Sequence, residues 1–173
     1  MGKYAILLHP DSQAQDMAKF IGEFDCKVDN KGRIALPSKL RMQIPAGMEQ
    51  TMVINRGFEC CLVLYVMEDW NKESEKLNIL NEFNRESRRF IRQYNNGANI
   101  LSVDNNARIL IPKKLLDYAE IKGNVVLSAY GNKIEIWSEK NYKEEMSFDA
   151  DDFGSTAEKL LGNKPGDIQD ANR

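Results

Sequence analysis

The chain has 173 residues, of which 42% are hydrophobic and 29% charged, and its formal net charge is −2. This composition is typical of a globular protein with one ordinary domain or two small ones, and it excludes a chain that is basic throughout. Any contact with nucleic acid must therefore come from a local concentration of Lys and Arg.

The cysteines and the single histidine exclude several kinds of site. Cys26, Cys60 and Cys61 show no CxxC spacing, which favours reduced thiols in a reducing cytoplasm over a disulfide framework. His9 is the only histidine, so we expect neither a histidine-containing metal site nor a Ser-His-Asp triad in the folded part. No stretch has the roughly 18 apolar residues of a membrane span. We expect a cytoplasmic protein without cofactor or metal that is not an enzyme.

The first elements follow an extension, residues 1–19, which we expect to lack regular structure; translation from Met17 is an alternative explanation for part of it. The stretch "GEFDCKVD" alternates apolar and polar residues, which is typical of a half-buried strand. "RIALP" is a short β-branched run closed by a proline, and "PSKLRMQI" then predicts a helical turn or two. We assign residues 20–68 to a first β-rich repeat.

Residues 69–98 form a polar, helix-favouring connector. A second repeat is predicted over residues 99–143, with "RILIP" as a strand and "PKKLLDYAEI" as a helix. "VVLSAYGNKIEIW" predicts a hairpin with Gly131 and Asn132 at its turn. The acidic tail, residues 144–173, has few apolar residues, and we expect it to lack regular structure.

The two halves repeat the same phrase. "VDNKGRIALPSKL" begins at Val28, and "VDNNARILIPKKL" begins at Val103. Neither half has enough strand to enclose a core alone, so we expect the halves to pack together or to exchange strands. We therefore predict an α+β, mainly β fold in which two pseudo-symmetric motifs pack as a small barrel with short helices.

Each repeated phrase holds an Asp and an Arg four residues apart: Asp29 with Arg33, and Asp104 with Arg108. One interpretation is a small ion pair that fixes a loop, although an exposed pair contributes only about 0–1 kcal/mol. The other is a carboxylate that orients the guanidinium toward a base or a phosphate.

The two loops differ at one position that affects the backbone. Gly32 of the first loop can adopt a positive φ, whereas Ala107 stands at the corresponding place in the second. We expect Asn105 or Asn106 to take that conformation in the second loop, which would make the two loops unequal.

Two groups of basic residues are candidate contacts to DNA or to another subunit. The first surrounds the repeated phrases: Lys27, Lys31, Lys39, Arg41, Lys113 and Lys114. The second has helical spacing in the connector, which places four guanidinium groups on one face: Arg85, Arg88, Arg89 and Arg92. For this second group an interface role is favoured over DNA contact, because Arg is a common interface anchor.

Several stretches together resemble the MraZ family of bacterial transcriptional regulators. They run in order from Phe20 to Tyr142: "IGEFDCKVDNKGRIALPSKLR", "NRGFECCLVLYVMEDW", "RRF" and "VDNNARILIPKKLLDYAEI". The likeness does not include the residues before Met17 or the tail after Tyr142.

The resemblance implies a fold related to the AbrB-like swapped-hairpin barrels and ring-shaped homo-oligomers. It also implies a nucleoid-associated protein that binds short direct repeats in double-stranded DNA. The family's target is the promoter of the division and cell-wall gene cluster, including its own gene, which it usually represses. Its DxxxR motif falls on Asp29 and Arg33 and on Asp104 and Arg108, with Lys31 beside the first pair. An AbrB-like antitoxin and an oligomeric interaction scaffold remain the alternatives.

Overall fold

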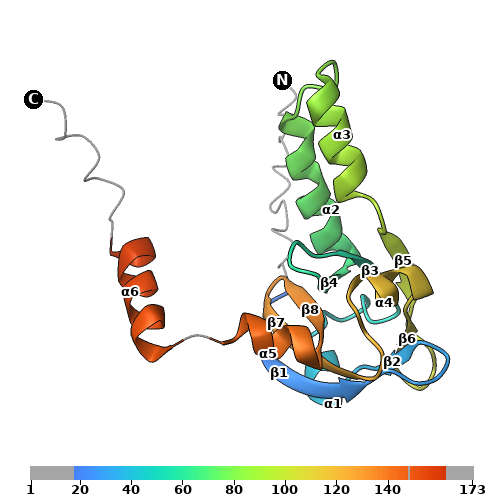
Figure 1. The fold of residues 1–173 in the computed structure, drawn as a ribbon. Helices are drawn as coiled ribbons and strands as arrows, with labels where there is room; N and C mark the ends of the chain where they lie inside the picture. Colours follow the sequence, from blue (N-terminus) through green and yellow to red (C-terminus); the bar gives the residue numbers. More distant parts are fainter. Residues whose placement is uncertain (1–17, 148, 163–173) are drawn as a thin grey trace, which may run out of the picture.

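The computed structural model describes residues 18–147 and 149–162 (Figure 1). This part of the chain is α+β and mainly β, as predicted. It contains a six-stranded antiparallel sheet, a two-stranded ribbon and short helices. Residues 1–17, for which we expected no regular structure, lie outside the described residues.

The elements follow one another in the same order in both halves. The first half contains β1 (Phe20–Lys27), β2 (Arg33–Ala35), α1 (Ser38–Arg41), β3 (Thr51–Arg56) and β4 (Leu62–Val66). The second contains β5 (Asn99–Ser102), β6 (Arg108–Leu110), α4 (Lys113–Tyr118), β7 (Asn124–Gly131) and β8 (Lys133–Ser138). The connector forms α2 (Met67–Glu75), the 3-10 helix η1 (Lys76–Ile79) and α3 (Arg85–Tyr94), and β8 is followed by α5 (Glu139–Glu145).

Local sequence explains most of these elements. Exposed positions alternate with more buried ones along β1, as its polar and apolar residues predict. Pro37 and Pro112 stand directly before α1 and α4 with φ of −55° and −56°, values that suit the start of a helix. The predicted hairpin is confirmed as β7 and β8, which are joined at Asn132.

The halves exchange strands within the large sheet. The sheet has the order β1-β7-β8-β4-β3-β5. The first strand of each half therefore pairs with the third strand of the other half: β1 pairs with β7, and β5 pairs with β3. Strands β4 and β8, the last of each half, meet in the middle. The small ribbon joins the remaining two strands, β2 and β6.

The predicted small barrel is not a closed one in the described part of the chain. Within the described residues, the end strands β1 and β5 do not pair with each other. The β2–β6 ribbon lies between them and is joined to the sheet strands only by single bridges, Val28 with Ile34 and Val103 with Ile109.

The main core fills the space between the ribbon and one face of the sheet. Ile34 and Ile109 point inward from the ribbon and are fully buried, together with Leu64, Leu127 and other sheet residues. A smaller aromatic cluster covers the opposite face around Tyr65. The α2–α3 hairpin projects from the body (Figure 1), and Trp70 stacks on Tyr94 between its helices.

The tail differs from the expectation. It contains a further helix, α6 (Ala150–Leu161), where the sequence predicted no regular structure. Figure 1 shows α6 standing apart from the body, beyond α5. Phe153, Leu160 and Leu161 recur at helical spacing in this segment, a signal that its polar composition concealed. Residues 163–173 lie outside the described part.

Candidate nucleic-acid interface

The two Asp-Arg loops lead into the two strands of one ribbon. Arg33 is the first residue of β2 and Arg108 the first of β6, and the strands are antiparallel. Arg33 lies opposite Leu110, and Arg108 lies opposite Ala35. Opposite residues share a face, so both arginines are on the exposed face while the central isoleucines are buried beneath it.

The first loop is closed around its carboxylate. Asp29 Oδ1 accepts hydrogen bonds from the backbone N–H groups of Lys31 at 2.8 Å and Arg33 at 2.9 Å. Asp29 Oδ2 accepts from Arg33 Nε at 2.7 Å. The Asp29 N–H in turn donates to the Arg33 carbonyl at 2.9 Å. One side chain therefore fixes both the backbone of the turn and the direction of the arginine.

The second loop repeats this arrangement. Asp104 Oδ1 accepts from the N–H groups of Asn106 at 2.8 Å and Arg108 at 2.9 Å, and Oδ2 accepts from Arg108 Nε at 2.9 Å. The side chains of Arg33 and Arg108 keep 27% and 29% of their surface exposed. A guanidinium has five donors, so each arginine retains donors for an outside acceptor.

The expected difference between the loops is wrong. Ala107 itself adopts the left-handed conformation, with φ of +56°, where Gly32 has φ of +82°. Its N–H donates to the Asp104 carbonyl at 2.8 Å, as the Gly32 N–H does to Asp29 at 3.0 Å. The hydrogen bonds of Asp104 hold the turn in spite of the steric cost of a Cβ at positive φ.

The electrostatics of the two carboxylates follow from these hydrogen bonds. The Arg33 backbone N–H, helped by the Arg33 guanidinium and the Lys31 N–H, lowers the pKa of Asp29 from 3.8 to about 2. The Arg108 backbone N–H likewise lowers the pKa of Asp104. Both carboxylates are therefore charged at neutral pH.

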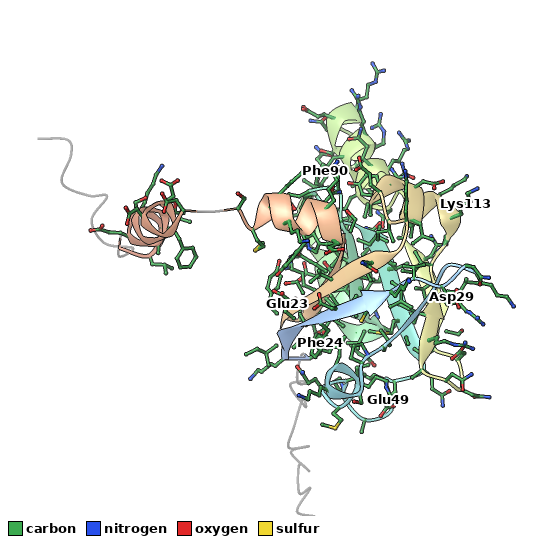
Figure 2. The ribbon with its side chains drawn as sticks, turned by 60° about the horizontal axis from the view of Figure 1, so that its bottom comes forward. Glu23, Phe24, Asp29, Glu49, Phe90 and Lys113 are labelled. Carbon is green, nitrogen blue, oxygen red and sulfur yellow. The ribbon has the colours of Figure 1, made fainter. Side chains whose placement is uncertain are left out.

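Each loop is hydrogen-bonded to the segment between the ribbon strand and the helix of the other half. The Gly32 carbonyl accepts from the Ile111 N–H, and the Ala107 carbonyl accepts from the Leu36 N–H, both at 2.9 Å. Figure 2 shows Asp29 and Lys113 on the same side of the body. The strand exchange thus brings basic residues of both halves around the ribbon.

The other residues of the first basic group are placed along the elements that flank the ribbon. All are exposed: Lys27 at the end of β1, Lys31 in the first loop, Lys39 and Arg41 in α1, Lys113 and Lys114 in α4. Their exposure leaves them able to contact phosphates.

The structure does not bring the second basic group to the ribbon. Arg85, Arg88, Arg89 and Arg92 lie on α3, in the projecting hairpin, whereas β2 and β6 lie at the other end of the body (Figure 1). Arg88 Nη1 donates to the Glu82 carbonyl at 2.7 Å, which helps to close the turn before α3.

Two exposed apolar residues of the ribbon were absent from the predicted site. Leu110 is 56% exposed and Ala35 is also exposed, each directly opposite an arginine. Alternation along a strand places residues two apart on one face, so Leu110 was predictable from Arg108. Its position opposite Arg33 depends on the exchange between the halves and carried no local signal.

Two kinds of feature are missing from the described residues. None of the helices in this part is long and apolar enough to cross a membrane. Over the same residues, no three His, Cys, Asp or Glu side chains are grouped so that they suit a metal ion.

Comparison with known proteins gives one family. The family described as "MraZ protein, putative antitoxin-like" matches residues 19–93 and 96–163. The chain is 41% identical over 148 residues to the transcriptional regulator MraZ of Christiangramia forsetii, a match that covers 85% of this chain and 96% of that protein. It is 39% identical over 145 residues to the protein of the same name from Cytophaga hutchinsonii, with 84% and 96% covered. For the one from Clostridium tetani the identity is 37% over 141 residues, with 82% and 96% covered. The chain, with both of its Asp-Arg loops inside the matched segments, belongs to the MraZ family.

Proposed function

We propose that the protein is a DNA-binding transcriptional regulator that contacts DNA through the exposed face of the β2–β6 ribbon. The carrying observation is the presence of Arg33 and Arg108 on one exposed face, each with its Nε held by a carboxylate. The names of the relatives support a role in transcription.

The ribbon has suitable chemistry for the major groove. That groove admits a two-stranded β-ribbon, and an arginine fork can donate two hydrogen bonds to a guanine edge. Asp29 and Asp104 restrict the rotamers of the arginines, so less side-chain entropy is lost on binding. Leu110 and Ala35 offer apolar contacts of the kind that thymine methyl groups accept. Lys31, Lys39, Arg41, Lys113 and Lys114 are proposed phosphate contacts.

The strand order of the sheet bears on symmetry within the chain and on its assembly. When the elements of the halves are exchanged, the sheet order β1-β7-β8-β4-β3-β5 reads the same from either end, which supports a pseudo-two-fold relation between them. We propose a ring-shaped homo-oligomer in which successive subunits meet successive direct repeats of a promoter. Simultaneous contacts would raise the effective affinity of individually weak ribbons. We further propose a nucleoid-associated repressor of the division and cell-wall gene cluster, including its own gene.

The test is fluorescence-anisotropy binding to the DNA upstream of the protein's own gene, compared with random DNA, across a salt series. Arg33→Ala and Arg108→Ala should each weaken specific binding by about 1–3 kcal/mol. Arg92→Ala is a matched control that removes the same charge from α3, and it should change the affinity by less than about twofold if the ribbon alone reads DNA. The oligomeric state of every variant is measured by light scattering.

The outcomes separate the proposal from its alternatives. Equal affinity of wild type and both ribbon variants would leave Asp29–Arg33 as a structural pair and overturn the proposed contact. An interaction scaffold predicts that wild type binds its own upstream DNA no better than random DNA. If Arg92→Ala lowered the DNA affinity as much as Arg33→Ala does, α3 would also have to contact DNA.

A further inference from the structure

Helix α6 has an apolar stripe without a partner in the described part of the chain. Phe153, Leu160 and Leu161 are 69%, 71% and 83% exposed. With Ala157 they follow the i, i+4, i+7, i+8 spacing of one helix face. Helices of about 12 residues are marginal alone in water, and most helical stability in proteins comes from packing of such a face. A stable α6 therefore needs another surface against which its apolar stripe can pack.

The charge of α6 restricts what that surface can be. The helix has three acidic residues, Asp151, Asp152 and Glu158, with Asp149 at its N-cap, and one basic residue, Lys159. Two α6 helices would repel each other through these charges, which disfavours a simple pair of α6 helices. The receiver should combine an apolar hollow with an excess of positive charge beside it.

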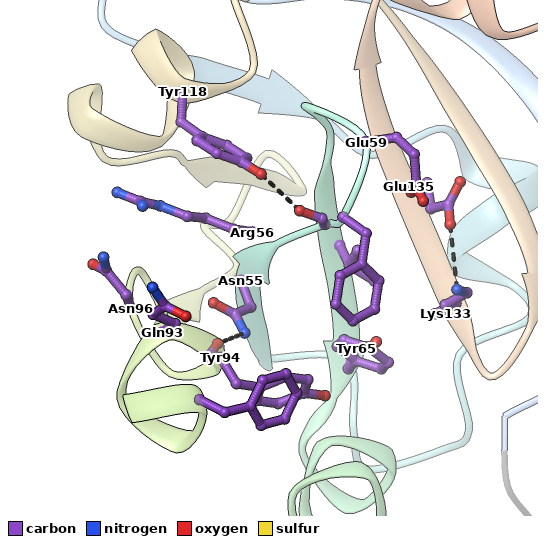
Figure 3. A pocket seen from close by; sticks show the side chains of 14 residues that line it. Asn55, Arg56, Glu59, Tyr65, Gln93, Tyr94, Asn96, Tyr118, Lys133 and Glu135 are labelled. Atoms are coloured by element: carbon purple, nitrogen blue, oxygen red, sulfur yellow. Dashed lines mark hydrogen bonds and ion pairs between the residues drawn. The ribbon is translucent and has the colours of Figure 1, made fainter. Parts of the chain in front are cut away.

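A pocket of about 490 Å³ between the β3–β4 hairpin and α3 has these properties (Figure 3). Five aromatic side chains line it, among polar ones: Tyr65 from β4, Phe90 and Tyr94 from α3, Tyr118 from α4 and Phe58 from the β3–β4 turn. Phe58 is 80% exposed and Phe90 43% exposed, although both line a concave surface. Apolar groups of this size in a hollow favour an apolar occupant.

The polar groups of the pocket indicate that the occupant also carries hydrogen-bonding groups. Asn55 is only 3% exposed, and its Oδ1 has no hydrogen-bond partner among the described residues. Arg56 Nε is also buried and likewise has no hydrogen-bond partner among the described residues. Buried groups of this kind are costly unless a ligand, partner or water satisfies them.

The pocket lining holds two basic residues, Arg56 and Lys133, and two acidic ones, Glu59 and Glu135, so the excess positive charge beside the pocket lies on α3, which has four arginines and one glutamate. Lys133 and Glu135 line the pocket and pair with each other at 3.3 Å, so they offset one another. Arg56 lies over the Tyr118 ring at 4.8 Å and forms no ion pair within residues 18–147 and 149–162. On α3, Arg89 is four residues before the pocket residue Gln93 and therefore flanks the opening.

We infer that this pocket receives α6 of a second copy of the chain, with Phe153 as the aromatic anchor and the acidic residues of α6 facing Arg56 and Arg89. The inference rests on the proposed self-assembly and gives it a specific contact. The pocket contains Lys133 at the start of β8, whereas α5 begins only after Ser138 at the other end of that strand. Figure 1 likewise shows α6 and α3 on different sides of the body, which favours another chain as the receiver.

The direct test places the photoreactive amino acid p-benzoylphenylalanine at position 153 of the full chain. Irradiation should give a cross-linked dimer on a denaturing gel, and mass spectrometry should map the adduct to a peptide containing Phe58 or Phe90. The same probe at Ser155, on the opposite face of α6, is the matched control and should give little adduct. Gln93→Trp, an exposed substitution that fills the pocket, should lower the adduct yield at least about tenfold.

The readouts distinguish failure of this contact from failure of the proposed function. An adduct within one chain, an adduct outside the pocket, or a yield unaffected by Gln93→Trp would overturn the inference. DNA binding of the same preparations is measured separately by anisotropy. Normal binding without the dimer adduct would reject only the α6 contact, whereas the adduct without specific DNA binding would reject only the proposed function.

Discussion

Arg33 and Arg108 are diagonal neighbours on the exposed face of one ribbon, because Arg33 lies opposite Leu110 and Arg108 lies opposite Ala35. Diagonal neighbours of this kind are roughly 7–8 Å apart. Successive bases of one DNA strand are about 3.4 Å apart along the axis. A ribbon in the groove would therefore address bases about two steps apart, and the two loops would act as one contact surface.

The geometry of the guanidinium should matter more than its charge. Arg33→Lys keeps the charge but loses the planar fork and its Nε bond to Asp29. We expect the salt dependence of binding to stay close to that of wild type, while discrimination between own and random DNA falls by about 1–3 kcal/mol. Anisotropy titrations at several salt concentrations measure both quantities. Unchanged discrimination would show that Arg33 contacts phosphate only.

The carboxyl groups of the loops should titrate unusually low. Asp29 has its pKa lowered to about 2, so its contribution to loop stability is complete above the ordinary value of 3.8 and is lost as the pH falls through about 2. The pKa of Asp104 is lowered in the same direction. Carboxyl ¹³C NMR titration measures both pKa values, and we expect no change in the charge of either carboxylate between pH 5 and 8.

A single variant tests the cause of that pKa. The largest contribution at Asp29 comes from the backbone N–H of Arg33, which Arg33→Ala retains. We therefore expect the pKa of Asp29 in Arg33→Ala to remain below 3.8. A return to 3.8 would mean that the guanidinium, and not the turn, holds the carboxylate.

The two loop positions with positive φ should respond in opposite directions to exchange of Gly and Ala. Ala107→Gly removes a Cβ from a left-handed residue and should stabilise the fold by about 0.5–1 kcal/mol after the greater freedom of the unfolded chain is counted. Gly32→Ala should destabilise it by about 1–2 kcal/mol. A Cβ there would also lie 3.3 Å from Leu116 Cδ1 and from the Ile111 carbonyl. Urea unfolding at equilibrium measures both changes.

Packing of the buried face of the ribbon should hold its exposed face in position for DNA binding. Ile34 and Ile109 lie opposite each other and are 0% exposed. Ile34→Ala should cost about 2–5 kcal/mol of stability and weaken DNA binding without removing a contact to DNA. Ile34→Val is the matched control, with an expected cost of about 0.5–1.5 kcal/mol and near-normal binding. Normal DNA binding by a folded Ile34→Ala variant would show that binding does not require the ribbon to be packed tightly on the core.

Local patterns in the sequence predicted many elements but not their partners. Alternation identified β1, and proline followed by a helical pattern identified α1 and α4. Alternation specifies which face of a strand is buried, and it carries no information about the neighbouring strand. The pairing of β1 with β7 and the joining of β2 with β6 therefore came only from the structure.

In the candidate site, too, sequence predicted some features and missed others. The spacing of Asp29 and Arg33 and of Asp104 and Arg108 predicted two loops, each with a carboxylate beside an arginine, and the structure contains both contacts. Sequence propensity placed the positive φ on Asn105 or Asn106, because Ala rarely adopts it. The side-chain and backbone hydrogen bonds of Asp104 override that propensity at Ala107.

The exchange of strands also has a consequence for biosynthesis. Lys27, at the end of β1, pairs with Asn124, about 100 residues later. At a translation rate of roughly 5–20 residues per second, β1 leaves the ribosome some 5–20 s before its partner strand exists. During that interval the nascent first half can form the β3–β4 hairpin, but it exposes the edge that β1 will later share with β7. Such edges are prone to pair with other chains, so the growing polypeptide is most exposed to misassembly on polysomes, before its own second half arrives.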